Sequence, residues 1–199
     1  DIVAVAISSV VPPLTGVFVQ ACQDYLQLEA LVVDAGVKTG VPIRCDDPRQ
    51  VGADRVVDTA AARKLYGCPA CIVDFGTATT FDAVSEQGEY LGGAIAPGIE
   101  IAADALFQRA AKLPRVDLIA PPAAIGSNTS HAIQSGLIYG YVGLVEGMVR
   151  RFGVELGPDM KVIGTGGLAE TVARETDVIQ IVDPWLTLEG LRIVWELNS

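Results

Sequence analysis

Basic residues are scarce in this sequence. Lysine and arginine number 14 against 24 aspartate and glutamate residues, so the formal net charge is −10, and the basic residues form no cluster. Nucleic acids and anionic membranes are bound through local concentrations of lysine and arginine. The composition therefore argues against both kinds of partner. It also predicts that any anionic ligand is held by a few placed cations, backbone N–H groups or a metal ion.

Cysteine is limited to four residues, and no signal-peptide pattern stands at the start of the sequence. Thiols stay reduced in the cytoplasm, so we expect a cytoplasmic protein. Cys68 and Cys71 form a single C-P-A-C pair with no second pair and no neighbouring histidine. One such pair is weak support for zinc or redox chemistry, and we expect these two residues to be buried thiols.

Long hydrophobic runs are limited to one, residues 132–149. This run contains Glu146, leads into Arg150, and carries glycines at 136, 140, 143 and 147. Small residues at this spacing let two helices approach closely. Because no second apolar run accompanies it, we expect a buried helix packed tightly against a partner and no membrane anchor.

Apolar residues, in contrast, make up 50% of the chain, enough for one large or two small globular domains. Their spacing alternates between strand-like and helix-like patterns. The first part of the chain is expected to form strands at 2–10 and 30–36 and helices at 12–26 and 53–67.

From residue 70 three strand-like runs follow in quick succession, with turns at Gly76 and Gly88, which indicates an antiparallel meander. The meander strands are expected at 70–75, 79–85 and 89–95, followed by helices at 98–112 and from about 128, a strand at 161–167, a helix at 168–175, a strand at 178–183 and a helix at 184–197.

This order of elements predicts an α/β architecture in which one module occurs twice. The first copy lacks its opening meander, so we expect the chain to begin inside a domain and to be a fragment or a truncated product. We assign residues 1–67 to the remainder of the first domain and residues 68–199 to the second, which contains the glycine-spaced helix.

The segment VGADR places Asp54 and Arg55 at the start of a helix, directly after Gly52 and Ala53. A carboxylate there can accept a proton from a substrate hydroxyl, and the guanidinium can hold a substrate anion through paired N–H groups. Alternatively, Asp54 only caps the helix and Arg55 pairs with a surface acid, since helix starts favour aspartate electrostatically. The local pattern does not decide between the two.

The segment DFGTATT suits a phosphate and a cation. Asp74 at a strand end can ligate a cation, and Gly76 with Thr77 and Thr79 can present backbone N–H and hydroxyl groups to phosphate oxygens. Two more glycine turns between strand and helix occur at 91–98 and 164–167. Each turn is weak support alone, but three of them in an α/β chain favour nucleotide binding.

These segments resemble the type III pantothenate kinases over essentially the whole chain. That family belongs to the actin-like, sugar-kinase superfamily, whose duplicated ribonuclease H-like domains clasp ATP between them. The pair GADR and DFGTATT is specific to it. The matching segments are VGADR (51–55), DFGTATTFD (74–82), LGGAIAPG (91–98), NTSHAIQSG (128–136) and GTGG (164–167).

The resemblance implies ATP-dependent phosphorylation of pantothenate to 4'-phosphopantothenate, the first step of coenzyme A biosynthesis, by a homodimer. It implies that Asp54 is the general base for the pantothenate hydroxyl. It also implies that Gly52, Ala53, Asp54, Arg55 and Thr129 contact pantothenate.

For the nucleotide, the resemblance implies that Thr77 binds ATP, together with Gly76 and the glycines Gly166 and Gly167 of the GTGG turn. ATP would act with Mg²⁺. Asp74 resembles the ligand of a monovalent cation, potassium or ammonium, which the family requires.

The sequence departs from the family at two places. No D-x-G-N-T segment, which cradles the ATP phosphates in the family, precedes IVAVAISSV. Cys45 stands seven residues before Gly52, where the family usually has a tyrosine that lines the pantothenate pocket. The thiol is smaller and a poorer hydrogen-bond donor, so we expect weakened or reshaped substrate binding.

Two other functions remain open from the sequence. One is a non-catalytic regulatory or binding homologue, like the Bvg accessory factor-like proteins, although the acidic charge argues against direct DNA binding. The other is a kinase of the same superfamily that acts on another small hydroxy acid or a sugar.

Overall fold

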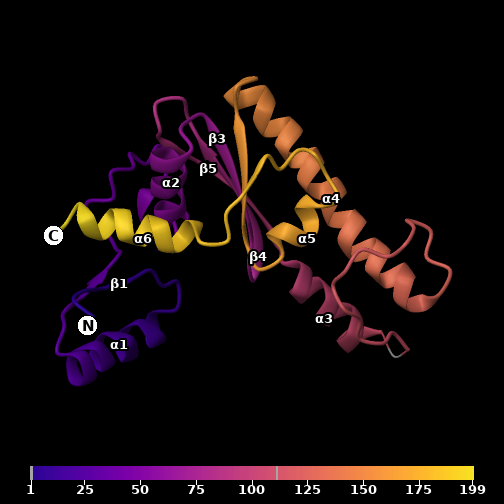
Figure 1. Cartoon of the computed structure of the whole chain (residues 1–199), viewed down its shortest axis with the longest axis horizontal. Coiled ribbons are helices and arrows are strands. Elements are labelled where there is room, and N and C mark those ends of the chain that lie inside the picture. The colour runs from indigo at the N-terminus through magenta and orange to yellow at the C-terminus, as the bar shows by residue number, and fades with distance from the viewer. Residues whose placement is uncertain (1, 111) are drawn as a thin grey trace.

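The computed structural model describes residues 2–110 and 112–199 (Figure 1). Helices and strands follow the predicted order. In chain order they are β1 (Val5–Ile7), α1 (Pro12–Ala21) with a π-helical turn (Cys22–Leu26), β2 (Ala30–Val32), a 3₁₀ turn (Pro48–Gln50), α2 (Ala53–Leu65), β3 (Ala70–Phe75), β4 (Ala78–Val84), β5 (Tyr90–Pro97), α3 (Ile99–Arg109), α4 (Thr129–Leu156), β6 (Lys161–Gly166), α5 (Ala169–Ala173), β7 (Ile181–Val182) and α6 (Leu186–Glu196).

Strands β3 to β7 form one sheet in the order β5-β4-β3-β6-β7. β3, β4 and β5 pair antiparallel, which confirms the predicted meander, and β6 and β7 continue the sheet parallel to β3. Phe75 pairs with Gly166, so β3 and β6 end side by side. The register therefore brings Asp74 next to the glycine turn that follows β6.

The side chains of β3 alternate between two cores, as the pleat of a strand requires. Cys71, Val73 and Phe75 pack in the core that includes α3, α4 and α5. Ala70 and Ile72 pack in the core that includes α2 and α6. Figure 1 shows these two groups of helices on opposite sides of the sheet. Asp74, at an even position of β3, consequently shares the α2 side.

Helices α2 and α6 pack so closely that one residue of α6 must be glycine. A Cβ atom on Gly190 would lie 2.0 Å from the backbone oxygen of Val57 in α2. Because the obstacle is backbone within a helix, it cannot move aside as a flexible side chain could.

We expect Gly190→Ala to reduce the free energy of unfolding by roughly 2–3 kcal/mol, the upper range for overpacked cores. Urea unfolding measures this. Gly16→Ala in α1 is the matched control, since a Cβ there would meet nothing within 4 Å, and it should leave stability equal or slightly higher because alanine favours helix. Equal effects of the two substitutions would contradict the close α2–α6 contact.

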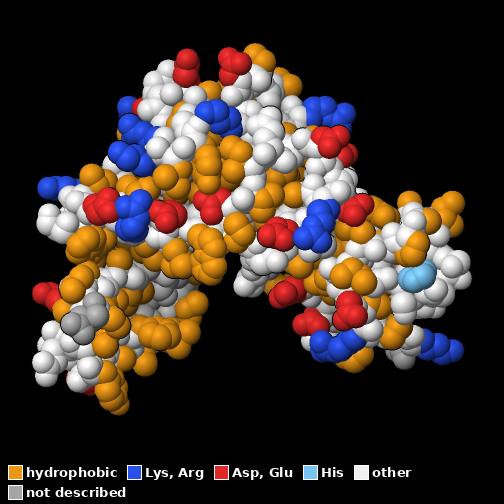
Figure 2. All heavy atoms as spheres, in the orientation of Figure 1, with side chains coloured by type: hydrophobic (Ala, Val, Ile, Leu, Met, Phe, Trp, Pro, Cys, Tyr) orange, Lys and Arg blue, Asp and Glu red, His pale blue; other side chains and the backbone are white. Residues whose placement is uncertain are grey.

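The segment before α2 is only partly packed against the rest of the protein: Val33 and Val41 join the core of α2 and α6, whereas β1, β2 and α1 stand apart from the main sheet. β1 and β2 pair in parallel as a two-stranded sheet, and no residue of α1 is buried. Leu14, Val17 and Phe18 of α1 are all more than half exposed, and Figure 2 shows hydrophobic side chains gathered on this lobe. Such a patch is suited to contact with another apolar surface.

Several expected elements are shorter than predicted, among them the strand expected at 30–36, which ends at Val32. The first strand ends at Ile7 because the hydroxyl of Ser9 accepts the N–H of Val11 and turns the chain into α1. β7 has two residues because the side-chain oxygen of Gln180 accepts the N–H of Val162, where a backbone carbonyl would continue the ladder. The helix expected at 98–112 ends at Arg109.

Helix α4, which contains the long hydrophobic run, has one buried side and one open side. Its buried side packs on the sheet, while Gly136, Gly140 and Gly143 are exposed and have open space where a Cβ would be. Within the described residues, no helix has the length and apolar character needed to cross a membrane. The expectation of a buried helix thus holds for one side of α4 only.

Candidate active site

Asp54 lies in the first turn of α2, and its carboxylate is hydrogen-bonded to the backbone of that turn. Its Oδ1 accepts the N–H of Arg55 at 2.8 Å, which holds the carboxylate against the first turn of the helix. A Cβ on Gly52, the residue that caps α2, would lie 2.4 Å from the same Oδ1. Gly52 is therefore needed for the carboxylate to occupy this place. The helix N-terminus also favours its negative charge.

Asp74 faces α2 from the end of β3. Burial raises its pKa to about 6, and the charge of Asp54 adds to the shift. The two carboxylates are thus close enough to interact, although they come from different elements. A Cβ on Gly166 would lie 2.5 Å from Asp74 Oδ1. Because Gly166 has no side chain, the turn that follows β6 can approach the Asp74 carboxylate this closely.

The three glycine turns meet at this edge of the sheet. Gly76 and Thr77 form the exposed tip of the β3–β4 hairpin. A Cβ on Gly98 would lie 2.3 Å from the carbonyl oxygen of Thr77, and one on Gly166 would lie 2.7 Å from that of Phe75. Gly166 has a φ of 87°, which favours glycine. The structure therefore brings together all three segments from which nucleotide binding was predicted.

The guanidinium of Arg55 is held by β4. Its Nε donates to Asp82 Oδ1 at 2.6 Å, and the two side chains are 16% and 1% exposed. Its Cζ lies 5.6 Å from the centroid of the Tyr90 ring, a cation–π contact. Arg55 is thus paired with a buried acid, and the alternative of a surface partner is wrong. Cys45 lies near this group, close to the phenol of Tyr90.

A cavity of about 770 Å³ opens beside the start of α2. Gly52 and Ala53 line it from α2, Ser9 from the end of β1, and Arg49 from the 3₁₀ turn. This volume is within the range of small-molecule sites. Gly52 and Ala53, both expected to contact the substrate, therefore border a space large enough for a small-molecule substrate.

Thr129 is not brought to this site. It begins α4, on the opposite side of the sheet from α2 (Figure 1). The side chain is exposed and lies next to Asn128, whose side chain caps the helix by accepting the N–H of His131. Within one chain, Thr129 and Asp54 are separated by the sheet.

Asp58 lies one turn after Asp54 on α2 and is 2% exposed. It is hydrogen-bonded to Thr187 of α6, while its Oδ1 has no hydrogen-bond partner in the described part of the chain. Burial, with a smaller contribution from the charges of Asp74, Asp82 and Asp54, raises its pKa to about 8. Asp58 is therefore a neutral carboxylic acid at neutral pH.

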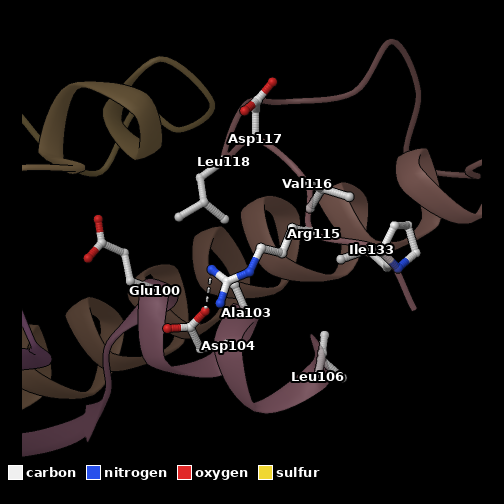
Figure 3. A pocket seen from close by; sticks show the side chains of 10 residues that line it. Glu100, Ala103, Asp104, Leu106, Arg115, Val116, Asp117, Leu118 and Ile133 are labelled. Atoms are coloured by element: carbon white, nitrogen blue, oxygen red, sulfur yellow. Dashed lines mark ion pairs between the residues drawn. The ribbon is translucent and has the colours of Figure 1, made fainter. Parts of the chain in front are cut away.

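A second cavity, of about 410 Å³, lies between α3, the loop that follows it, and α4 (Figure 3). Arg115 crosses it, with Nη1 3.1 Å from Asp104 Oδ1 and Cζ 4.4 Å from the centroid of the Phe107 ring. Because this guanidinium is already paired and Glu100 adds further negative charge, the cavity does not suit an anionic ligand. It lies on the side of the sheet away from α2.

Sequence reasoning assigned no role to Asp82, Asp58 or Tyr90. Asp82 stands within DFGTATTFD, and an acid inside a strand of otherwise apolar or β-branched residues was the available signal. Asp58 follows Asp54 by four residues, which places both on one face of a helix. For Tyr90 the sequence offers no comparable signal.

The described residues contain no group of three or more His, Cys, Asp or Glu side chains placed to hold a metal ion. The oxygens nearest Gly166, Asp74 Oδ1 and the carbonyl of Phe75, are ligands of the kind that hard cations prefer.

Comparisons with known proteins agree with the sequence segments. A family model described as type III pantothenate kinase matches residues 1–151. A type III pantothenate kinase of Moorella thermoacetica is 57% identical over 199 residues, which are 100% of this chain and 78% of that protein. A type III pantothenate kinase of Roseiflexus castenholzii is 54% identical over 193 residues, 97% of this chain and 76% of that protein.

Among solved structures, a protein of Campylobacter jejuni proposed to be a Baf family transcriptional activator is similar with a TM-score of 0.60 and 21% identity. The match covers 86% of this chain and 82% of that one. At this identity the likeness shows the fold alone. It confirms the predicted α/β, ribonuclease H-like fold class.

Proposed function

The chain belongs to the type III pantothenate kinase family, which transfers a phosphoryl group from ATP to pantothenate, and we propose that Asp54 is the general base of this reaction. The protein is therefore a phosphotransferase of coenzyme A biosynthesis. One observation supports the role of Asp54 most: its carboxylate is fixed at a helix start, and Asp74 and the three glycine turns lie at the adjoining sheet edge. Phosphoryl transfer requires alignment of this kind more than covalent chemistry.

In this proposal the residues of the site have separate roles. Asp54 takes the proton of the pantothenate hydroxyl as the oxygen attacks the γ-phosphate. Thr77, Gly166 and Gly167 approach the phosphates with backbone N–H groups. Gly76, whose own N–H donates to the carbonyl oxygen of Ala78 at 3.1 Å, contributes by keeping the hairpin tip free of a side chain. Mg²⁺ bound to ATP supplies positive charge that this acidic chain lacks.

Pantothenate also carries a carboxylate, which Arg55 is suited to bind. We place the rest of the molecule in the cavity bordered by Gly52 and Ala53. Cys45, which lies near Tyr90, stands where the family usually has a tyrosine, and in this proposal the smaller thiol alters pantothenate binding.

The position of Thr129 supports a homodimer. If Thr129 contacts pantothenate, it must do so from a second copy, because the sheet separates it from Asp54 within one chain. The exposed glycines of α4 would let two such helices pack closely. The proposal includes a cytoplasmic location, which the four free cysteines support.

The proposed cation ligand can be tested directly. We expect Asp74→Asn to raise the potassium or ammonium concentration for half-maximal activity by at least roughly tenfold, because even partners of metal ligands change affinity on that scale. The measurement is the rate of pantothenate phosphorylation as potassium is titrated. Asp159→Asn, in an exposed loop, is the matched control. Superimposable titrations of Asp74→Asn and the parent protein would remove Asp74 from the cation site.

A further inference from the structure

Asp82 is a buried aspartate in β4 that has no role in the reaction proposed above. Its side chain is 1% exposed and faces α2. Three donors surround it: Arg55 Nε at 2.6 Å, the hydroxyl of Thr80 at 3.3 Å, and the hydroxyl of Tyr90. A carboxylate that accepts from three donors is held in one orientation, and so is the guanidinium paired with it.

The pairing leaves one edge of the Arg55 guanidinium free. Nε donates to Asp82, and Nη2 donates to the carbonyl oxygen of Phe81 at 3.4 Å, so the Nε–Nη2 edge faces β4. Nη1 makes no hydrogen bond to any residue in 2–110 or 112–199. The 16% of the side chain that is exposed is therefore available to a ligand.

A glycine in the neighbouring strand β5 leaves room for this guanidinium. Gly93 of β5 stands directly opposite Asp82. A Cβ on Gly93 would lie 1.8 Å from the carbonyl oxygen of Phe81 and 2.7 Å from Arg55 Nη2. Any other residue at this position would displace Arg55 from β4.

We propose that Asp82 is a positioning residue that determines specificity: through its ion pair it fixes Arg55 with its free N–H edge toward the carboxylate of pantothenate. The inference rests on the proposed function, because it requires pantothenate to be the ligand. A planar guanidinium recognises a carboxylate only when its orientation is set. Asp82 would thus confer preference for a carboxylate-bearing alcohol over an uncharged one.

The test compares two ligands that differ at one end. Pantothenate carries the carboxylate and pantothenol an alcohol, and calorimetry measures the Kd of both for the parent protein, Asp82→Asn, Arg55→Ala and the double variant. We expect Asp82→Asn to raise the Kd of pantothenate roughly tenfold, in the range found for contacting pairs, and to leave the Kd of pantothenol unchanged. In the Arg55→Ala background, Asp82→Asn should have no further effect on either ligand.

Equal weakening of both ligands, or no weakening of either, would overturn the inference. Failure of the parent protein to bind pantothenate would instead overturn the proposed function, and the inference with it. Tyr90→Phe is the second variant in case Asp82→Asn does not fold, because it removes one donor from Asp82 and leaves the ion pair. It should raise the Kd of pantothenate roughly two- to tenfold, the scale of one hydrogen bond, again without changing that of pantothenol.

Discussion

Asp54→Asn should lower kcat for pantothenate phosphorylation roughly 10²- to 10⁴-fold, the usual contribution of a general base. Asparagine has nearly the same shape and can still accept the N–H of Arg55, which Asp54 does at 2.8 Å. It cannot take a proton from the substrate hydroxyl. The KM for ATP should change little, because the glycine turns that face the phosphates are untouched. Steady-state kinetics with saturating potassium measure both constants.

Asp46→Asn is the matched control for this substitution, since Asp46 is exposed and precedes α2 by a few residues. It should leave kcat unchanged. If Asp54→Asn retained kcat within tenfold of the parent protein, Asp54 would be only a helix-capping residue, the alternative that the sequence left open.

Asp58→Asn should make the folded protein more stable at pH 8 than the parent. Burial raises the pKa of Asp58 to about 8 from an ordinary value of 3.8. Between these values the folded chain holds a proton that the unfolded chain has lost. The contribution of Asp58 is therefore fully present below pH 3.8 and is lost as pH rises toward 8, by about 1.4 kcal/mol per pH unit. Because asparagine does not ionise, Asp58→Asn lacks this contribution to the dependence of stability on pH.

Urea unfolding of both proteins from pH 5 to pH 8 measures this effect. Other buried acids, such as Asp74 and Asp82, titrate in both proteins, so the difference between the two curves isolates Asp58. Asp159→Asn, at an exposed position, should show no such difference. A constant difference between Asp58→Asn and the parent across this range would show that Asp58 is not held neutral by the fold.

The sequence predicts the order of elements well because their signals are local. The turns at Gly76 and Gly88 delimit the meander, and the structure confirms both. Strand ends were harder to place. The first strand ends at Ile7 because of the hydroxyl of Ser9, and β7 is shortened by the side chain of Gln180. Such side-chain bonds to backbone are invisible to apolar periodicity.

The residues of the candidate site also differ in whether the local sequence reveals their role. Asp54 and Asp74 were predicted because each stands at the end of an element, where a motif is readable. Asp82 was missed because its importance depends on which face of β4 meets α2, a property of the assembled sheet. Thr129 has a motif around it, but the sheet separates it from Asp54, a relation that a linear sequence does not contain.

The most direct test of the account is the detection of 4'-phosphopantothenate from ATP and pantothenate, with and without potassium or ammonium. It should be made on this chain and on a form preceded by a D-x-G-N-T segment. The account predicts cation-dependent product in the extended form, and none once Asp54 is replaced by asparagine. Absence of product from both forms, in folded protein supplied with Mg²⁺ and either cation, would contradict it.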